Sequence, residues 1–512
     1  MATRTQPNIL VCFTDQQRAD TIAALGNPVI RTPALDRLCA SGVAFTNAFS
    51  PSPVCISARC SMIHGQYPWH TGCYENTRMP TDGRETYMAA LTTAGYRTHG
   101  IGKCHFSPDP LALRGFETRE VQEEIVRDPA SDDYLRFLHE RGFRHVADPH
   151  GIRGEMYYVP QPSQAPAELH PTHWVGDRAV AFLRDQAGQQ RPWCLFASFI
   201  HPHPPFAVPN PWHKLYRAPL MPLPNVPPDS EALLTYINRL QSRYKYRDQG
   251  TDRNLLRCLK AYYYASISFV DAQIGRILAT LEATGQLDRT VILFTSDHGE
   301  LLGDYNAFGK RSMHDACARI PMLLSWPGRL AGGQVCNAPV SLVDVAPTLC
   351  AAAGTRIGSH ALDGLDLASI AEGTARREAV FAQHAVIPPV AGARDLHDHP
   401  ESRAALSTYM AVSRDWKYVY SATDHREFLF DRRSDPAETR NRAGLGLCRE
   451  PLQALRAALV EELRAAGETG GLQPDGSWRE FPRLALSPDP DAHLLVQDHP
   501  WADTRIPGYT NP

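Results

Sequence analysis

Three apolar runs of strand length constrain the fold of this chain most, because each of them ends in polar residues. They span Ile9–Phe13, Cys194–Ile200 and Thr290–Thr295. Uninterrupted apolar runs of this length are typical of strands buried on both faces of a parallel sheet. Between the last two runs, residues from about Asn254 to Thr284 repeat apolar side chains at helical spacing. We therefore expect an open α/β sheet whose site lies beyond the carboxyl ends of its strands.

The polar residues that follow these runs carry ligand chemistry. Asp15 and Gln16 follow the first run, and Asp297 and His298 follow the third. Oxygen-dominated sets of this kind suit calcium, magnesium or manganese, and the single imidazole also admits zinc. An Asp-His pair before glycine is, by itself, more typical of a turn. Because two strands deliver such residues, we predict a divalent metal site.

Cys55 stands four residues before Arg59 in the segment Pro51–Gly65. The residues before it are strand-like and interrupted by proline, and those after it can open a helix. A helix N-terminus presents backbone N–H groups that favour anions, and Arg59 would lie one turn along the same face. That arrangement suits an anionic transition state. The alternative is a buried structural cysteine, which is the usual state of this residue type.

This segment resembles the modification motif of type I sulfatases, in which a cysteine followed by x-P-x-R is oxidised to formylglycine (3-oxoalanine). Ser57 and Ala58 stand where that motif usually carries proline and serine. The resemblance runs from about Asn8 to Asn441. Further segments follow the order of the family's motifs: Asp15–Gln16, Gly102–His105, Pro202–Pro205, Thr295–Gly299, Phe308–Lys310, Arg319–Pro321, Val343–Thr348 and Leu429–Pro436.

The resemblance to this family of the alkaline phosphatase superfamily implies an α/β fold, an alkaline-phosphatase-like α/β/α sandwich with a largely parallel central sheet. Shorter strand-like pieces after Asp366 and the amphipathic stretch Leu452–Ala466 predict a smaller C-terminal α+β domain with an antiparallel sheet. We place the catalytic domain at residues 1–375 and the smaller domain, with an extended tail, at residues 376–512. The composition of the tail also admits disorder, but its large apolar residues indicate that it packs against another surface: Trp478, Phe481, Leu484, Leu494 and Trp501.

The resemblance also implies a metal site and groups that balance its charge. An oxygen of the formylglycine hydrate derived from Cys55 would bind the metal, and Arg59 and Lys103 would steady that hydrate and offset charge. The implied metal ligands are Asp15, Gln16, Cys55, Asp297 and His298.

Four further residues are carried over from the family by position. His105 would hydrogen-bond the hydrate and help the covalent intermediate to collapse. His203 and Lys310 would contact the sulfate and protonate the leaving oxygen. Asn76 would touch the substrate, although it reads equally well as a turn residue.

These parts predict an enzyme, a sulfuric ester hydrolase acting on small organic sulfate monoesters of the aryl sulfate type. One hydroxyl of the hydrate would attack sulfur, and the other would expel sulfate by re-forming the aldehyde. The closest alternative is a phosphonate monoester or phosphodiester hydrolase of the same superfamily, although Lys103 better suits a sulfate monoester. A second alternative is a catalytically inactive, sulfatase-like binding protein in which Cys55 stays unmodified.

Aromatic and proline residues are expected to wall the approach to the site. The segment Pro202–Pro211, with Phe206, Trp212 and Tyr216, would form one side, and Tyr74 the other. Such walls suit a small, partly apolar ester better than an extended polymer. The alternative is that these aromatic residues only pack the loop.

Net charge and cysteine content limit which partners and which cellular location we expect for this protein. A net charge of −3, with no apolar run of membrane-spanning length, argues against nucleic acid and membrane partners. The twelve cysteines form no regular framework, and the N-terminal residues show no secretory pattern, so we expect a cytoplasmic protein. The expected partners are the sulfate ester, a formylglycine-generating enzyme and, through the C-terminal tail, a second copy of the chain.

Overall fold

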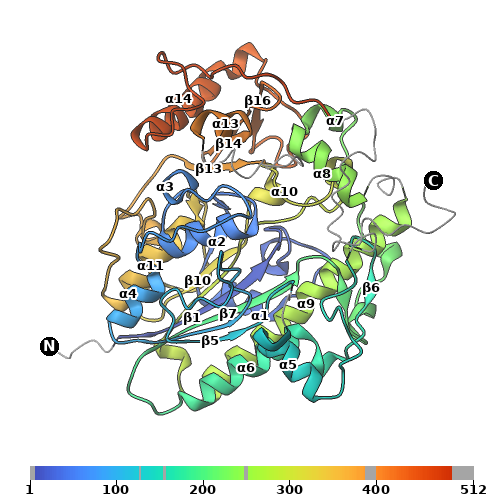
Figure 1. Cartoon of the computed structure of the whole chain (residues 1–512), viewed down its shortest axis with the longest axis vertical. Helices are drawn as coiled ribbons and strands as arrows, with labels where there is room; N and C mark the ends of the chain where they lie inside the picture. The colour runs from blue at the N-terminus through green and yellow to red at the C-terminus, as the bar shows by residue number, and fades with distance from the viewer. Residues whose placement is uncertain (1–5, 126–128, 154–156, 247–251, 387–398, 487–512) are drawn as a thin grey trace.

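The computed structural model describes residues 6–125, 129–153, 157–246, 252–386 and 399–486, and it is built around one eight-stranded sheet (Figure 1). The strand order is β11-β2-β10-β9-β1-β7-β4-β5. Strand β10 runs antiparallel to both of its neighbours, and every other pair is parallel. The strands are β1 (Asn8–Asp15), β2 (Val43–Phe45), β4 (Arg97–Gly102), β5 (Thr118–Val121), β7 (Trp193–Pro202), β9 (Thr290–Ser296), β10 (Met322–Ser325) and β11 (Gln334–Cys336). The predicted α/β fold with a largely parallel sheet is confirmed.

The three apolar runs of the sequence form adjacent strands at the centre of this sheet. Strand β1 lies between β9 and β7, and all residues of the three strands are buried. Asp15 lies opposite Pro202 on β7, and Thr14 lies opposite Ser296 on β9. The carboxyl ends of the strands therefore meet at one edge of the sheet.

Helices cover both faces of the sheet and bury its apolar side chains in two separate clusters (Figure 1). One face carries α1 (Pro33–Ser41), α5 (Asp133–Glu140), α6 (Pro171–Asp185) and α9 (Arg253–Ala283). The other face carries α2 (Cys55–His64), α4 (Tyr87–Thr93), α11 (Val345–Ala353) and α12 (Leu367–Ala371). Helix α9 confirms the long amphipathic helix expected between the second and third runs. In the described part of the chain, no helix has the length and apolar character needed to cross a membrane.

A separate four-stranded antiparallel sheet follows in the order β13-β14-β15-β16, as expected for the C-terminal part. Its strands are β13 (Val380–Ala385), β14 (Ser407–Val412), β15 (Trp416–Ser421) and β16 (Arg426–Asp431). One face packs on α14 (Arg449–Ala465), and the other packs on residues of the larger part such as Phe49 and Leu301. In Figure 1 this sheet and α14 lie together at one end of the molecule. The division at residue 375 stays a prediction.

Part of the predicted tail packing is confirmed. The Trp478 ring stacks on Tyr420, with ring centroids 4.2 Å apart, and its Nε1 donates to the hydroxyl of Tyr418 at 2.7 Å. Phe481 and Leu484 pack on the same cluster. Leu494 and Trp501 lie outside the described residues.

The remaining described strands and α-helices are short, apart from α8. They are β3 (Ala48–Phe49), β6 (Gln161–Pro162), β8 (Ala207–Val208), β12 (Val340–Ser341), α3 (Pro68–Thr71), α7 (Ser230–Leu233), α8 (Tyr236–Tyr246), α10 (Asp315–Ala318) and α13 (Pro400–Ala405).

Candidate active site

Four neighbouring parallel strands bring the predicted residues to the carboxyl edge of the central sheet. Asp297 and His298 follow β9, Asp15 ends β1, His203 follows β7, and Lys103 follows β4. All five side chains are buried. The strand order β9-β1-β7-β4 is therefore also the order of the functional groups across the site.

Gly102 makes the turn that directs Lys103 into the site. Its φ is +87°, and a Cβ atom there would lie 2.0 Å from the carbonyl oxygen of Ser198 on β7. Only glycine fits this conformation and this close approach. The lysine Nζ then reaches Asp15 Oδ2 at 2.7 Å.

Cys55 is the first residue of α2, as its sequence context predicted. Val54, at the N-cap position, makes no side-chain cap. Asn76 supplies one from outside the helix, because its Oδ1 accepts from the backbone N–H of Ile56 at 2.9 Å. Asn76, predicted to contact substrate or to be a turn residue, thus holds the start of the helix that carries residue 55.

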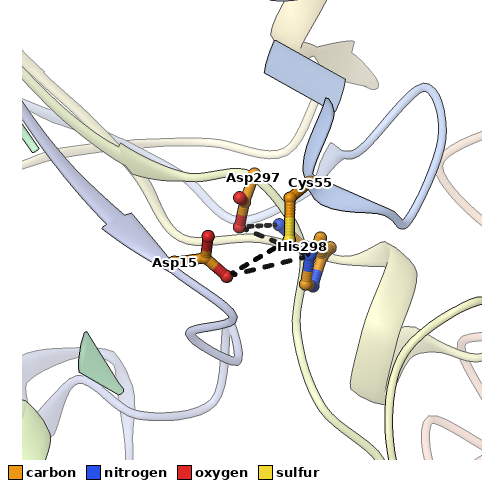
Figure 2. Close-up of side chains that lie close together, drawn as sticks. All are labelled: Asp15, Cys55, Asp297 and His298. Carbon is orange, nitrogen blue, oxygen red and sulfur yellow. Dashed lines mark hydrogen bonds and ion pairs between the residues drawn. The ribbon is translucent and has the colours of Figure 1, made fainter. Parts of the chain in front are cut away.

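Side chains that can bind a metal converge on Cys55, as Figure 2 shows. One ligand atom from each of Asp15, Cys55, Asp297 and His298 lies within 4.8 Å of the others. The Cys55 Sγ is 3.3 Å from His298 Nε2 and 3.6 Å from Asp15 Oδ1. The other ring nitrogen, Nδ1, lies 3.0 Å from the carbonyl oxygen of Gly299, and this contact leaves Nε2 for a ligand.

Gln16, the fifth predicted ligand, fits the same cluster. Its backbone N–H donates to Asp297 Oδ1 at 2.9 Å, and its side-chain Nε2 donates to Glu300. Its Oε1 is buried and has no hydrogen-bond partner among the described residues. Two carboxylates, an imidazole and an unpartnered amide oxygen form a donor set that fits a divalent cation.

Arg59 joins the two carboxylates of this cluster. Its Nη2 lies 3.1 Å from Asp15 Oδ2, and its Nε lies 3.1 Å from Asp297 Oδ2. Burial opposes the charge on Asp15, but Lys103 and other nearby cations hold its pKa well below the usual range. Burial and the charge on Asp15 together raise the pKa of Asp297 to about 6. The same surroundings therefore lower the pKa of Asp15 and raise the pKa of Asp297.

Lys310 and His203 approach Cys55 as a pair. The Lys310 Nζ donates to Cys55 Sγ at 2.7 Å and lies 3.1 Å from His203 Nε2. Burial and Asp15 oppose ionisation of the thiol, yet Lys310, Lys103 and His298 outweigh them and lower its pKa well below the usual value. An anionic group at residue 55 is thus stabilised by this site.

His105 comes three residues after the end of β4, beside Glu123. It is half-buried with φ +55°, and its backbone N–H donates to Glu123 Oε1 at 3.0 Å. Its Nδ1 has no hydrogen-bond partner among the described residues. No described hydrogen bond joins this ring to Cys55, so its predicted role stays a prediction.

Two glutamates that sequence reasoning missed belong to the site. Glu124 binds Lys103 Nζ at 2.6 Å and lies 3.5 Å from His203 Nε2. It follows β5, whose residues are largely polar and give no signal of a buried strand. Glu300 is buried beside Gln16, and its place directly after Asp297-His298-Gly299 was the available signal.

The predicted aromatic walls are instead part of the packing around α9. Phe206 and Tyr216 are buried, and their rings contact Tyr263 and Tyr264 of that helix. The Trp212 ring lies 4.8 Å from that of Phe269, also on α9. These side chains turn back onto the helix because that contact removes apolar surface from water. The contacts therefore agree with the alternative interpretation, in which these aromatic residues only pack the loop.

The other predicted wall, Tyr74, is buried as well. Its hydroxyl lies 3.4 Å from Glu468 Oε2, and the Arg403 guanidinium lies over its ring at 4.6 Å. Tyr74 thus packs towards the C-terminal part of the chain.

Comparison with known proteins agrees with this geometry. The family model described as sulfatase matches residues 7–355. The chain belongs to the sulfatase family. A second model, described as N-sulphoglucosamine sulphohydrolase, C-terminal, matches residues 303–466. The protein is therefore a sulfuric ester hydrolase of the alkaline phosphatase superfamily.

Relatives of this sulfatase differ in their substrates. It is 29% identical to an arylsulfatase of Clostridium perfringens, over 91% of this chain and 96% of the relative. It is 30% identical to a choline-sulfatase of Rhizobium meliloti, over 90% of this chain and 86% of the relative. The solved phosphonate monoester hydrolase of Agrobacterium radiobacter is 26% identical with a TM-score of 0.77, and the match covers 93% of this chain and 100% of that one.

Proposed function

We propose that this sulfatase hydrolyses small organic sulfate monoesters, aryl sulfates among them, with formylglycine derived from Cys55 as its nucleophile. One observation carries the proposal: residue 55 begins a helix and touches Asp15, His298 and Lys310 at once. Once oxidised and hydrated, this residue supplies two hydroxyls, one to attack sulfur and one to re-form the aldehyde as sulfate leaves.

We assign one divalent metal, with calcium ahead of manganese, magnesium and zinc, to the cluster around residue 55. Its ligands would be Asp15, Gln16, residue 55, Asp297 and His298. When bound, the metal supplies positive charge next to the sulfate oxygens.

Arg59 and Lys103 are assigned to charge compensation. Each is buried and contacts Asp15, and Arg59 also contacts Asp297, so both cations are fixed before substrate arrives. A sulfate monoester is an anion that repels an oxygen nucleophile. Cations that need no reorganisation lower that barrier most effectively.

Lys310 and His203 are assigned to the leaving group. Lys310 Nζ contacts both Cys55 Sγ and His203 Nε2, so a proton on either nitrogen would be available to the ester oxygen beside residue 55. Glu124 contacts both His203 and Lys103, so it connects a proposed proton donor with a charge-compensating cation. Asn76 would act mainly by holding the start of α2. His105 would hydrogen-bond the hydrate and help the covalent intermediate to collapse.

A phosphonate monoester or phosphodiester hydrolase remains the second candidate, because the Agrobacterium radiobacter enzyme shares the fold over nearly the whole chain. Lys103 in contact with Asp15 favours the sulfate ester. The test is a panel of aryl sulfate, choline sulfate, sulfated sugar and phenyl phosphonate at matched concentration. If phosphonate or phosphodiester turnover exceeds every sulfate ester by about tenfold in kcat/KM, roughly 1.4 kcal/mol, the second candidate replaces the first.

Maturation of Cys55 separates an active enzyme from the inactive, sulfatase-like binding protein. Protein co-produced with a formylglycine-generating enzyme should yield a tryptic peptide ending at Arg59 that is lighter than its thiol form in mass spectrometry. An active preparation that contains only the thiol would rule out this nucleophile. Substrate binding without turnover in fully thiol protein would instead identify the binding protein.

We also propose a cytoplasmic location, because all twelve cysteines are free of disulfides. Cell fractionation tests it. The tail proposed to mediate self-association begins at Gly470, and its residues 487–512 lie outside the described residues. Truncation of the tail followed by light scattering tests this proposal.

A further inference from the structure

Glu300 is a buried carboxylate that the assigned mechanism does not use. Its two oxygens accept four hydrogen bonds from different parts of the site. Oε2 accepts from Gln16 Nε2 and from the Tyr158 hydroxyl, the latter at 2.8 Å. Oε1 accepts from the backbone N–H groups of Leu302, at 3.0 Å, and Gly309. One oxygen therefore faces a proposed metal ligand, and the other faces the loop that leads into Lys310.

The contact with Gln16 fixes which end of that amide faces which way. An ionised carboxylate only accepts hydrogen bonds, and of the two ends of an amide only the NH₂ group donates. Glu300 therefore requires Gln16 Nε2 on its own side, which leaves Oε1 on the other. That oxygen is the buried atom without a hydrogen-bond partner among the described residues.

The main chain holds Glu300 in this position. Its own N–H donates to the carbonyl oxygen of Ala316 at 2.8 Å, and its carbonyl accepts from Arg18 Nη1 at 2.9 Å. The next residue, Leu301, donates its N–H to the carbonyl oxygen of Gly309 at 3.0 Å. These main-chain hydrogen bonds thus fix the position of the carboxylate between β9 and the Gly309–Lys310 loop.

We propose that Glu300 is a positioning residue for the metal site, which orients the Gln16 amide so that Oε1 is presented to the cation. Through Gly309 it also sets the loop that carries Lys310, so metal ligand and proton donor share one anchor. Partners that orient metal ligands in this way typically change metal affinity about 10- to 100-fold when they are replaced.

The test measures metal binding, apart from turnover. The full-length protein is stripped with a chelator and titrated with Ca²⁺, and in parallel with Mn²⁺, by calorimetry. Glu300→Gln keeps the side-chain volume but lets residue 300 donate, so the Gln16 amide can turn over. We expect this variant to bind the cation about 10- to 100-fold more weakly. Tyr158→Phe keeps the contact between Glu300 and Gln16, so its cation affinity should fall less.

A swapped pair distinguishes positioning from simple structural support. In Gln16→Glu/Glu300→Gln, the amide at residue 300 donates to a carboxylate at residue 16, whose other oxygen stays free. We expect this double variant to bind the cation more tightly than Glu300→Gln alone. It keeps the net charge of the wild type, so it also serves if the single variant does not fold.

Two results would overturn the role of Glu300. One is wild-type affinity in a folded Glu300→Gln protein, and the other is a swap that binds no better than the single variant or binds no metal. The inference rests on the proposed metal site, but different results would contradict the site and the role of Glu300. A wild-type protein that takes up neither cation would defeat the site, whereas normal wild-type binding with unchanged variants would defeat only Glu300.

Discussion

Arg311 holds Glu75 through a bidentate ion pair, with Nε to Oε2 and Nη2 to Oε1 both at 2.6 Å. Each partner adjoins a residue of the site. Glu75 precedes Asn76, whose side chain caps the helix that begins at residue 55, and Arg311 follows Lys310. The pair therefore joins the segment that caps α2 to the segment that carries Lys310.

Breaking this pair should destabilise the protein and loosen the site. The Glu75 side chain is only 2% exposed, so Arg311→Met leaves a buried charge unpaired, at a cost of about 3 kcal/mol in the free energy of unfolding. Denaturant unfolding measures this, and kcat should fall with it as Lys310 loses its support.

The matched control is Arg414→Met, whose arginine is 62% exposed in its pair with Asp415, so that its loss should change the free energy of unfolding far less. Adding Glu75→Gln to Arg311→Met should recover part of the lost stability, because the buried carboxylate is then neutral. Equal losses in Arg311→Met and the control would show that the pair is not a support.

Much of the site could be predicted because metal-binding residues follow the buried apolar strands in the sequence. The runs at Ile9–Phe13 and Thr290–Thr295 are apolar throughout because β1 and β9 are buried on both faces. Asp15 and Asp297 then appear where each run ends. The register of parallel strands brings these ends together, so the two carboxylates and His298 followed from strand ends, whereas Cys55, on a helix, entered the cluster through the family resemblance.

Features that depend on contacts between distant segments could not be predicted. The antiparallel direction of β10 is set by its pairing with β9 and β2, and nothing local records it. Glu124 reaches Lys103 only because β5 pairs with β4. Phe206 reads equally well as a wall or as core, and the decision lies in its contact with α9.

Neutralising Asp297 should remove the metal. Asp297→Asn keeps the size of the side chain but deletes one of two carboxylates from the cluster, so we expect metal content and turnover to fall by at least about 100-fold. Elemental analysis of the dialysed protein measures the metal. Asp271→Asn is the matched control, because that buried carboxylate accepts from the N–H groups of Ala34 and Leu35 at the start of α1, away from the cluster. Full metal content in Asp297→Asn would refute the ligand assignment.

Replacing Lys310 should slow poor leaving groups more than good ones. A general acid contributes about 10²- to 10⁴-fold, and its contribution grows with the basicity of the departing oxygen. We expect Lys310→Met to lose little on 4-nitrophenyl sulfate and much more on phenyl or alkyl sulfates, measured as kcat/KM across the series. His203→Gln, run alongside, shows which of the two contacting residues donates the proton. A loss of the same size on every ester would restrict Lys310 to charge compensation.

Acid should destabilise this fold in part through His314. The ring is buried against Tyr305, with centroids 4.3 Å apart, and against Phe430 of the small sheet at 5.6 Å. Burial, aided by nearby Lys417, lowers its pKa from 6.5 to about 3, while Asp315 acts in the opposite direction. The unfolded chain therefore binds one more proton between these pH values, so the stability is fully present above pH 6.5 and is lost as pH falls towards 3.

His314→Phe tests this account, because it keeps an aromatic ring against Tyr305 and Phe430 but cannot take up a proton. The slope of unfolding free energy against pH, measured by denaturant unfolding between pH 6.5 and 4, should decrease by up to about 1.4 kcal/mol per pH unit, the value for one proton. His145→Phe, at an exposed position, is the matched control for replacing a histidine by phenylalanine. If His314→Phe keeps the wild-type slope, protonation of this ring does not drive the loss of stability in acid.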